Sequence, residues 1–219
     1  MPPPNSPTPF EPFRALHQKY ANYTMVMEDV FISNLRIVQA CANAPGSVVE
    51  CGTWRGGMIA AMAEVLGPQR RYHLYDSFEG LPPAKEIDGP AALAWQADKT
   101  GPHYHDNCTA TEQSAREAMS LSGATDVRIV KGWFDQTVPS FSDPEGIAIL
   151  RIDGDWYDST LVCLENLYDR VVFGGVILID DYYVWDGCSK AVHDFLSRRK
   201  SAARIQQGVG VAFIRKTER

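Results

Sequence analysis

The chain has 219 residues, of which 45% are hydrophobic and 22% are charged, as is ordinary for a soluble globular protein with one buried core. Its 27 acids outnumber its 21 bases, and the formal charge of −6 argues against nucleic acid or an anionic membrane as the main partner. The five cysteines are odd in number and have no close pair, so neither a disulfide framework nor a zinc knuckle is indicated. No signal peptide or membrane span is recognisable, and we therefore expect a cytoplasmic protein.

The first half of the chain begins with a proline-rich tail, residues 1–12, which we expect to be disordered. Residues 13–219 are predicted to form one domain. Apolar residues at helical spacing predict a helix over residues 24–42, and a βαβ unit follows it. The strand, helix and strand of that unit are predicted at residues 47–51, 58–66 and 71–75.

The next segment, residues 81–105, is the least regular part of the chain. Its Pro82-Pro83, Gly89-Pro90 and Gly101-Pro102 pairs break any long element, so we expect a lid over the edge of the sheet.

The second half returns to alternating helices and strands, which predicts an α/β fold with a mostly parallel, doubly wound sheet. Only three residues separate the last two predicted strands, which is too short for a parallel crossover. The last strand should therefore run antiparallel to its neighbours. The helices and the crossover are predicted at 111–122, 156–170 and 187–199, and the strands at 127–130, 147–152, 176–179, 203–207 and 211–215.

Acidic residues follow two of the apolar strands. The first strand runs into Asp153 and Asp155, and the second into Asp180 and Asp181. Because parallel strands end at the same sheet edge, these carboxylates should meet there and repel one another unless a divalent cation lies between them. We therefore predict an Mg²⁺ site from Asp153, Asp180 and Asp181. For Asp155, ligation and simple capping of the following helix are equally good readings.

The turn after the first strand contains Glu50, Gly52 and Gly56. A dinucleotide fingerprint would need a glycine two residues after Gly52, where the chain has Trp54, so NAD binding is disfavoured. The acid-x-Gly-x-x-x-Gly pattern is instead typical of S-adenosylmethionine-dependent methyltransferases, whose cofactor has a cationic amino group that Glu50 could meet. Asp76, at the end of the second strand, stands where an acid accepts hydrogen bonds from ribose hydroxyls.

Several longer strings resemble one known family, the Mg²⁺-dependent O-methyltransferases similar to macrocin O-methyltransferase and the novobiocin-pathway sugar methyltransferase. They extend from about Tyr23 to the C-terminus. The most specific ones are Trp-Arg-Gly-Gly at 54–57 and Asp-Ser-Phe-Glu-Gly-Leu-Pro at 76–82, which the fold alone would not require. The other matching strings are at 23–25, 49–53, 131–134, 153–160 and 174–182.

The resemblance implies a Rossmann-like class I methyltransferase fold and a set of site residues. It implies that S-adenosylmethionine is bound by Thr24, Met25, Glu50, Gly52, Trp54, Asp76, Ser77, Gly132, Trp133 and Asp153. It implies metal ligation by Asp153, Asp180 and Asp181, with Asp153 also acting as general base. His103 or His105 on the lid could take the role of the base instead, although surface polarity is the more frequent reason for isolated histidines on a loop.

The reaction that this implies is methyl transfer to a hydroxyl of a small molecule, such as a sugar or another secondary metabolite. The acceptor, the pathway and a possible homodimer stay open. Two other functions are weighed against it: a non-catalytic cofactor-binding protein, which would not need the aspartates, and a metal-dependent phosphoryl-transfer or hydrolytic enzyme. The second is disfavoured because the chain has no phosphate-binding Gly-x-x-x-x-Gly-Lys-Ser/Thr loop.

Overall fold

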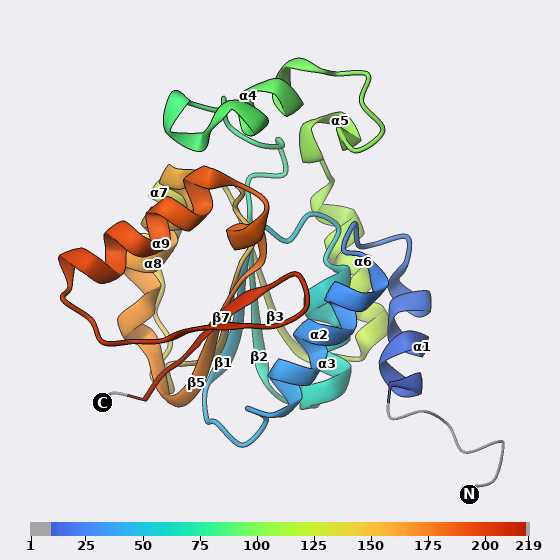
Figure 1. Ribbon diagram of the computed structural model, residues 1–219. Helices are drawn as coiled ribbons and strands as arrows, with labels where there is room; N and C mark the ends of the chain where they lie inside the picture. The colour runs from blue at the N-terminus through green and yellow to red at the C-terminus, as the bar shows by residue number, and fades with distance from the viewer. Residues whose placement is uncertain (1–9, 218–219) are drawn as a thin grey trace, which may run out of the picture.

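The computed structural model describes residues 10–217 and has a seven-stranded sheet at its centre (Figure 1). The strand order is β3-β2-β1-β4-β5-β7-β6. Strands β1 to β5 are parallel, and β7 is antiparallel to both β5 and β6. The predicted α/β class, the doubly wound sheet and the antiparallel last strand are thus confirmed. The strands are β1 (Ser47–Cys51), β2 (Arg71–Asp76), β3 (Asp126–Lys131), β4 (Ile147–Ile152), β5 (Val171–Ile179), β6 (Ile205–Gln207) and β7 (Ala212–Arg215).

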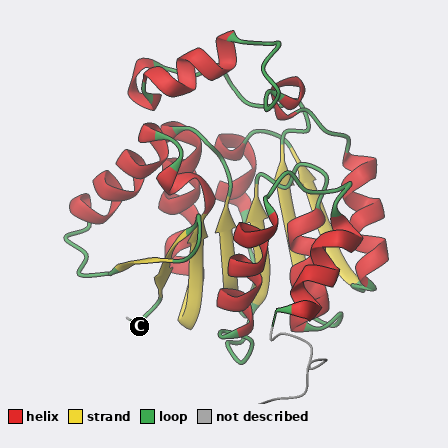
Figure 2. Cartoon of the chain, turned by 45° about the vertical axis from the view of Figure 1, so that its right-hand side comes forward, coloured by secondary structure: helices red, strands yellow, loops and turns green. Residues whose placement is uncertain are grey.

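Helices cover both faces of the sheet (Figure 2), and an apolar core is buried on each side. The central strands β1 and β4 are buried along their whole length, which explains their nearly continuous apolar sequences. One layer contains α1 (Glu11–Tyr20), α2 (Glu28–Gln39), α3 (Gly57–Leu66) and α6 (Glu112–Ser122). The other contains α7 (Phe134–Thr137), α8 (Tyr157–Leu167) and α9 (Asp186–Arg198), with the short 3₁₀ turns η2 (Val138–Ser140), η3 (Tyr168–Arg170) and η4 (Asp180–Tyr183).

The N-terminal region differs from the sequence-based prediction. Helix α1 was not predicted, although Pro12 suits the first turn of a helix, where its missing N–H has no intrahelical partner. Residues 1–9 of the predicted tail lie outside the described residues. The helix predicted over 24–42 is shorter, because Met27 is extended and α2 begins only at Glu28.

The segment predicted as a lid lies over the carboxyl ends of the parallel strands (Figures 1 and 2). It contains the 3₁₀ turn η1 (Glu86–Asp88) and the helix α4 (Pro90–Ala97), and the short turn α5 (His105–Cys108) follows it. The sequence hid α4 because Pro90 reads as a breaker, whereas it occupies the first turn of the helix. Within residues 10–217, no helix combines the length and the apolar character needed to cross a lipid bilayer.

Candidate active site

A cavity of about 950 Å³ opens between the carboxyl ends of the strands and the lid. In open α/β sheets this is the usual place for a ligand. Most of the site residues expected from the sequence lie on its wall, although they come from six separate segments of the chain. They are Met25, Gly52, Trp54, Asp76, Ser77, Gly132, Trp133, Asp153, Asp180 and Asp181.

Gly52 ends β1 at one side of this cavity, where the backbone turns with a φ of +87°. A Cβ atom at this position would lie 1.7 Å from the carbonyl oxygen of Asp153, so no other residue fits without moving the backbone of the neighbouring strand end. This close approach brings the end of β1 against the end of β4.

Asp76 holds the same turn from the end of β2. Its Oδ2 accepts hydrogen bonds from the backbone N–H groups of Thr53 at 2.8 Å and Trp54 at 2.7 Å, and its Oδ1 accepts one from Phe78 at 2.7 Å. Burial raises the pKa of this carboxyl, while the three N–H donors oppose that rise. Asp76 therefore both shapes the turn and presents a carboxylate edge to the cavity.

Glu50 does not lie on the cavity wall, contrary to the expectation that it meets the cofactor amino group. Its side chain is buried, accepts a hydrogen bond from the Thr53 hydroxyl at 2.6 Å and lies 3.1 Å from Nη1 of Arg151. Burial raises the pKa of Glu50 to about 7, against the opposing effect of the Arg151 charge. Thr24 also lies off the wall, where its hydroxyl accepts a hydrogen bond from the N–H of Val26.

Arg151 forms ion pairs with the acids beside the cavity, a contact that the sequence analysis overlooked. It is 1% exposed, and its guanidinium lies 2.6 Å from Asp153, 2.6 Å from Asp180 and 3.1 Å from Glu50. A buried cation among three carboxylates fixes their positions and offsets part of their mutual repulsion. The signal was available in the sequence, since Arg151 is the one charged residue in an otherwise apolar strand, Ile147–Ile152.

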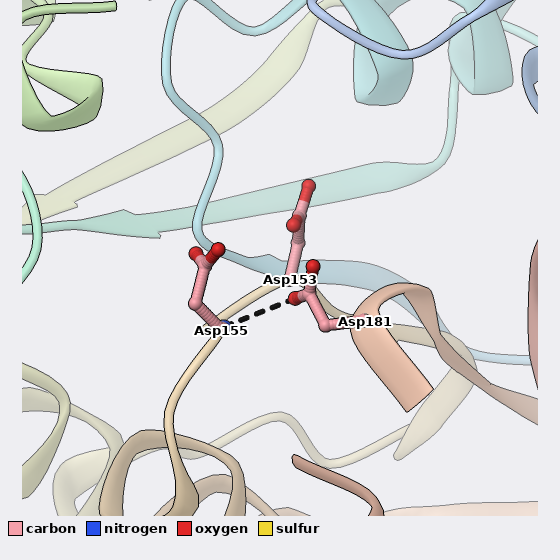
Figure 3. A group of neighbouring side chains, drawn as sticks. All are labelled: Asp153, Asp155 and Asp181. Carbon is pink, nitrogen blue, oxygen red and sulfur yellow. Dashed lines mark hydrogen bonds between the residues drawn. The ribbon is translucent and has the colours of Figure 1, made fainter. Parts of the chain in front are cut away.

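Three aspartates form the acidic cluster of the site: Asp153, Asp155 and Asp181, each with one carboxylate oxygen within 4.8 Å of the others (Figure 3). The backbone N–H of Asp155 donates to Oδ2 of Asp181 at 3.0 Å, and this bond ties the end of β4 to the end of β5. Asp155 adopts a left-handed φ of 57°, and Trp156 rather than Asp155 occupies the N-cap of α8. The capping reading of Asp155 is therefore wrong.

This cluster differs from the set of ligands predicted from the sequence. Asp155 belongs to it, whereas the side chain of Asp180 points to Arg151 and forms an ion pair with it. The convergence of acids at the ends of β4 and β5 was predicted correctly. The sequence could not show which of these acids pairs with a cationic side chain of the protein, because that depends on the position of the Arg151 side chain.

Two acids of this cluster, Asp155 and Asp181, are held in an environment that disfavours their charged forms. Burial, followed by the charge of Asp153, raises the pKa of Asp155 to about 8. Burial and the charges of Asp155, Asp153 and Asp180 raise the pKa of Asp181 well above its usual range. A hard divalent cation bound to these carboxylate oxygens would favour their charged forms again. The set of donor atoms therefore fits Mg²⁺.

Both lid histidines also line the cavity. The ring centroids of His103 and His105 are 6.4 Å apart, and His105 begins a turn of four residues with positive φ. Asn107 stabilises this turn, because its amide donates to the carbonyl of Leu81 at 2.8 Å and accepts a hydrogen bond from Gln96 at 3.0 Å. The two imidazoles are thus part of the cavity wall.

Comparison with known proteins shows similarity over most of the chain, not only at the site residues. The family model described as macrocin-O-methyltransferase (TylF) matches residues 18–215. A tetracenomycin-pathway rhamnosyl 4'-O-methyltransferase of Streptomyces olivaceus is 38% identical over 177 residues, which cover 76% of this chain and 65% of that protein. The demethyldecarbamoylnovobiocin O-methyltransferase of Streptomyces niveus is 35% identical over 163 residues, which cover 71% of this chain and 60% of that protein. The chain thus spans less than two thirds of the length of these two relatives.

Among solved structures, that of the O-methyltransferase NovP superimposes with a TM-score of 0.73 at 27% identity and covers 90% of this chain and 83% of its own. The calicheamicin methyltransferase CalS11 superimposes with a TM-score of 0.66 at 18% identity, over 97% of this chain and 95% of its own, which supports the fold alone. The Rossmann-like class I methyltransferase fold and the resemblance read from the sequence motifs are confirmed. On the extent of these matches, the chain belongs to the macrocin-O-methyltransferase family.

Proposed function

We propose that this protein is an S-adenosylmethionine-dependent O-methyltransferase that acts on a hydroxyl of a sugar or another secondary-metabolite acceptor and requires a divalent cation. The observation that carries the proposal is that one cavity is lined by two groups of residues, one suited to the cofactor and one suited to a cation. The glycine turn with Asp76 and the acidic cluster of Asp153, Asp155 and Asp181 open into the same space. A cofactor on the first and a hydroxyl on the second would then be neighbours.

The cofactor half of the cavity is formed by the turn after β1 and the ends of β2 and β3. Gly52 allows the ligand to approach the backbone closely, and Asp76 would accept hydrogen bonds from the ribose hydroxyls. Trp133 and Gly132 lie at the adjoining end of β3, where an adenine ring would pack. Thr24 and Glu50 would act behind this wall, Glu50 through its hydrogen bond with Thr53.

The acceptor half contains the acidic cluster, and Asp153, Asp155 and Asp181 are the residues that would hold Mg²⁺. When bound there, the cation would polarise the acceptor hydroxyl and so make it more acidic. Asp153 is the proposed general base, because it belongs to the acidic cluster and its backbone adjoins Gly52 at the end of β4. Arg151 would keep that carboxylate in place through its 2.6 Å contact.

A thermal-shift screen tests both halves of this proposal. Because a ligand that binds only the folded state raises the melting temperature, S-adenosylhomocysteine and Mg²⁺ should each stabilise the protein. Asp155→Asn should lose the shift with Mg²⁺ and keep the shift with S-adenosylhomocysteine. Absence of any shift with S-adenosylmethionine and S-adenosylhomocysteine would contradict the proposed function, whereas absence of the Mg²⁺ shift alone would contradict the metal requirement.

A further inference from the structure

Asp155 occupies an unfavourable backbone conformation in the loop between β4 and α8. Its φ of 57° lies in the left-handed region, which residues with a Cβ atom seldom adopt. Its backbone N–H donates to Oδ2 of Asp181 at 3.0 Å, and this bond fixes the backbone of Asp155 (Figure 3). Because the carboxylate can still rotate about the side-chain torsions, its orientation in the acidic cluster requires a contact of its own.

That contact comes from Trp185, the N-cap residue of α9. Its Nε1 donates to Oδ1 of Asp155 at 2.9 Å. Among residues 10–217, no other side chain donates a hydrogen bond to this carboxylate. Because an indole N–H is a donor only, Trp185 can orient the carboxylate without competing with it for a cation.

Trp185 is itself fixed to the other strand end that supplies the cluster. Its backbone N–H donates to the carbonyl oxygen of Asp181 at 3.0 Å, and its own carbonyl accepts the N–H of Ser189 in α9 at 3.2 Å. Three hydrogen bonds therefore join Asp155, Asp181 and Trp185 in a closed ring, which we call the Asp-Asp-Trp ring. Loss of the indole bond would leave the two acids joined through the backbone N–H of Asp155 and would free the carboxylate of Asp155.

Two further indole rings hold the ring of Trp185 in place. Its centroid lies 5.3 Å from that of Trp156 and 6.0 Å from that of Trp95, with an edge-to-face arrangement in both pairs. The Nε1 of Trp156 donates to the carbonyl of Pro82 at 2.9 Å, and the Nε1 of Trp95 donates to the carbonyl of His103 at 3.3 Å. Of these three indole N–H groups, only that of Trp185 thus reaches an acid of the cluster.

From the Asp-Asp-Trp ring we infer that Trp185 is a positioning residue, whose indole N–H holds the carboxylate of Asp155 in the orientation that binds a divalent cation together with Asp153 and Asp181. Packing alone would need only the aromatic ring of Trp185 and would not need its N–H to meet an acid. The inference rests on the proposed function and adds to it a residue behind the three ligands. Loss of such a hydrogen-bond partner of a ligand group typically weakens metal binding about tenfold to a hundredfold.

Calorimetric titration of the full chain with Mg²⁺ tests this inference. Trp185→Phe keeps an aromatic ring for packing and removes the N–H, so its Kd for Mg²⁺ should rise about tenfold or more. Trp95→Phe removes an indole N–H that does not reach the cluster, and as the matched control it should leave this Kd unchanged. Equal Kd values in wild type and Trp185→Phe would overturn the inference, and so would equal losses of affinity in both variants.

Intrinsic fluorescence provides a second readout, which a purely structural role of Trp185 would not change. Because the indole N–H of Trp185 bonds directly to a proposed ligand, Mg²⁺ should change the emission of wild type and of Trp95→Phe, and this change should be lost in Trp185→Phe. No change in the emission of wild type with Mg²⁺ bound would overturn the inference even if Trp185→Phe does not fold. Binding of S-adenosylhomocysteine, measured first, should be equal in all three proteins and shows that each is folded. Absence of Mg²⁺ binding in wild type would instead contradict the proposed metal requirement, and the inference would fail with it.

Discussion

The guanidinium of Arg151 lies 2.6 Å from the carboxylate of Asp180, across the ends of the neighbouring parallel strands β4 and β5. This ion pair divides the acids at the sheet edge into two sets. Glu50 and Asp180 share a cation that the protein supplies, whereas Asp155 and Asp181 have none among their described contacts. Asp153 belongs to the acidic cluster and also contacts Arg151. We assign to Mg²⁺ the positive charge that Asp155 and Asp181 lack.

The first prediction concerns the stability that depends on Arg151. Arg151→Met removes the cation and leaves Glu50 and Asp180 buried without it, which should reduce the free energy of unfolding by about 3 to 5 kcal/mol. Urea denaturation of the metal-free protein measures this change. Adding Glu50→Gln to Arg151→Met should recover part of the loss, because one buried charge is then removed. A loss below about 1 kcal/mol in the single variant would mean that the network contributes little.

The second prediction concerns pH. Because the pKa of Asp155 is about 8 when folded and ordinarily 3.8, the folded state holds a proton that the unfolded state has lost between these values. The stability that this proton provides is present at low pH and is lost as the pH rises through the folded pKa. In EDTA, wild type should therefore lose stability between pH 5 and pH 8.5 relative to Asp155→Asn, measured by urea denaturation. Parallel pH profiles for the two proteins would contradict the assignment.

The effect of Mg²⁺ should follow the same titration, because the cation and the proton compete for the cluster. The increase in melting temperature that Mg²⁺ causes should thus be larger at pH 8.5 than at pH 6.

The third prediction concerns cofactor binding at Asp76. Asp76→Asn keeps the size of the side chain but loses the charge that strengthens its hydrogen bonds, which are worth about 1 to 3 kcal/mol for charge-assisted pairs. Affinity for S-adenosylhomocysteine should fall about tenfold or more by calorimetry. Asp135→Asn, at another residue of the cavity wall, serves as the control and should bind normally. Unchanged affinity in Asp76→Asn would remove Asp76 from the cofactor site.

The fourth prediction compares two glycines with positive φ. Gly52→Ala would place a Cβ atom 1.7 Å from the carbonyl oxygen of Asp153, whereas Gly67→Ala, at a φ of +101°, would meet no atom within 4 Å. Gly67→Ala should cost only backbone strain of about 1 to 3 kcal/mol. Gly52→Ala should cost clearly more and also abolish binding of S-adenosylhomocysteine. Equal losses of stability in the two variants would show that the close approach of β1 to β4 at Gly52 is not required for the folded structure.

The sheet was the part of the fold that the sequence predicted best. Strand β1 begins and ends at the predicted residues, because a buried apolar run between a Pro-Gly turn and a glycine turn has one plausible reading. Helices α1 and α4 were missed because their sequences allow more than one interpretation. Each has a proline in its first turn, which local patterns treat as a breaker and tertiary structure accepts as a helix start.

The site was predictable in its location and less so in its internal contacts. The ends of parallel strands must meet, so the convergence of the acids followed from the topology. The orientation of Glu50 toward Arg151, and of Asp155 toward the acidic cluster, depends on side-chain packing and on the left-handed φ of Asp155. Neither property has a periodic signature in the sequence.

The most direct test of the central claim is acceptor-dependent formation of S-adenosylhomocysteine from S-adenosylmethionine on a panel of sugars and glycosides, with and without EDTA. We predict turnover that chelation abolishes and added Mg²⁺ restores. Asp153→Asn should lose about 10² to 10⁴ in rate while its affinity for S-adenosylhomocysteine stays within a few fold. Full turnover in EDTA, or a fully active Asp153→Asn protein, would contradict the claim that the acidic strand ends form a metal-dependent methyl-transfer site.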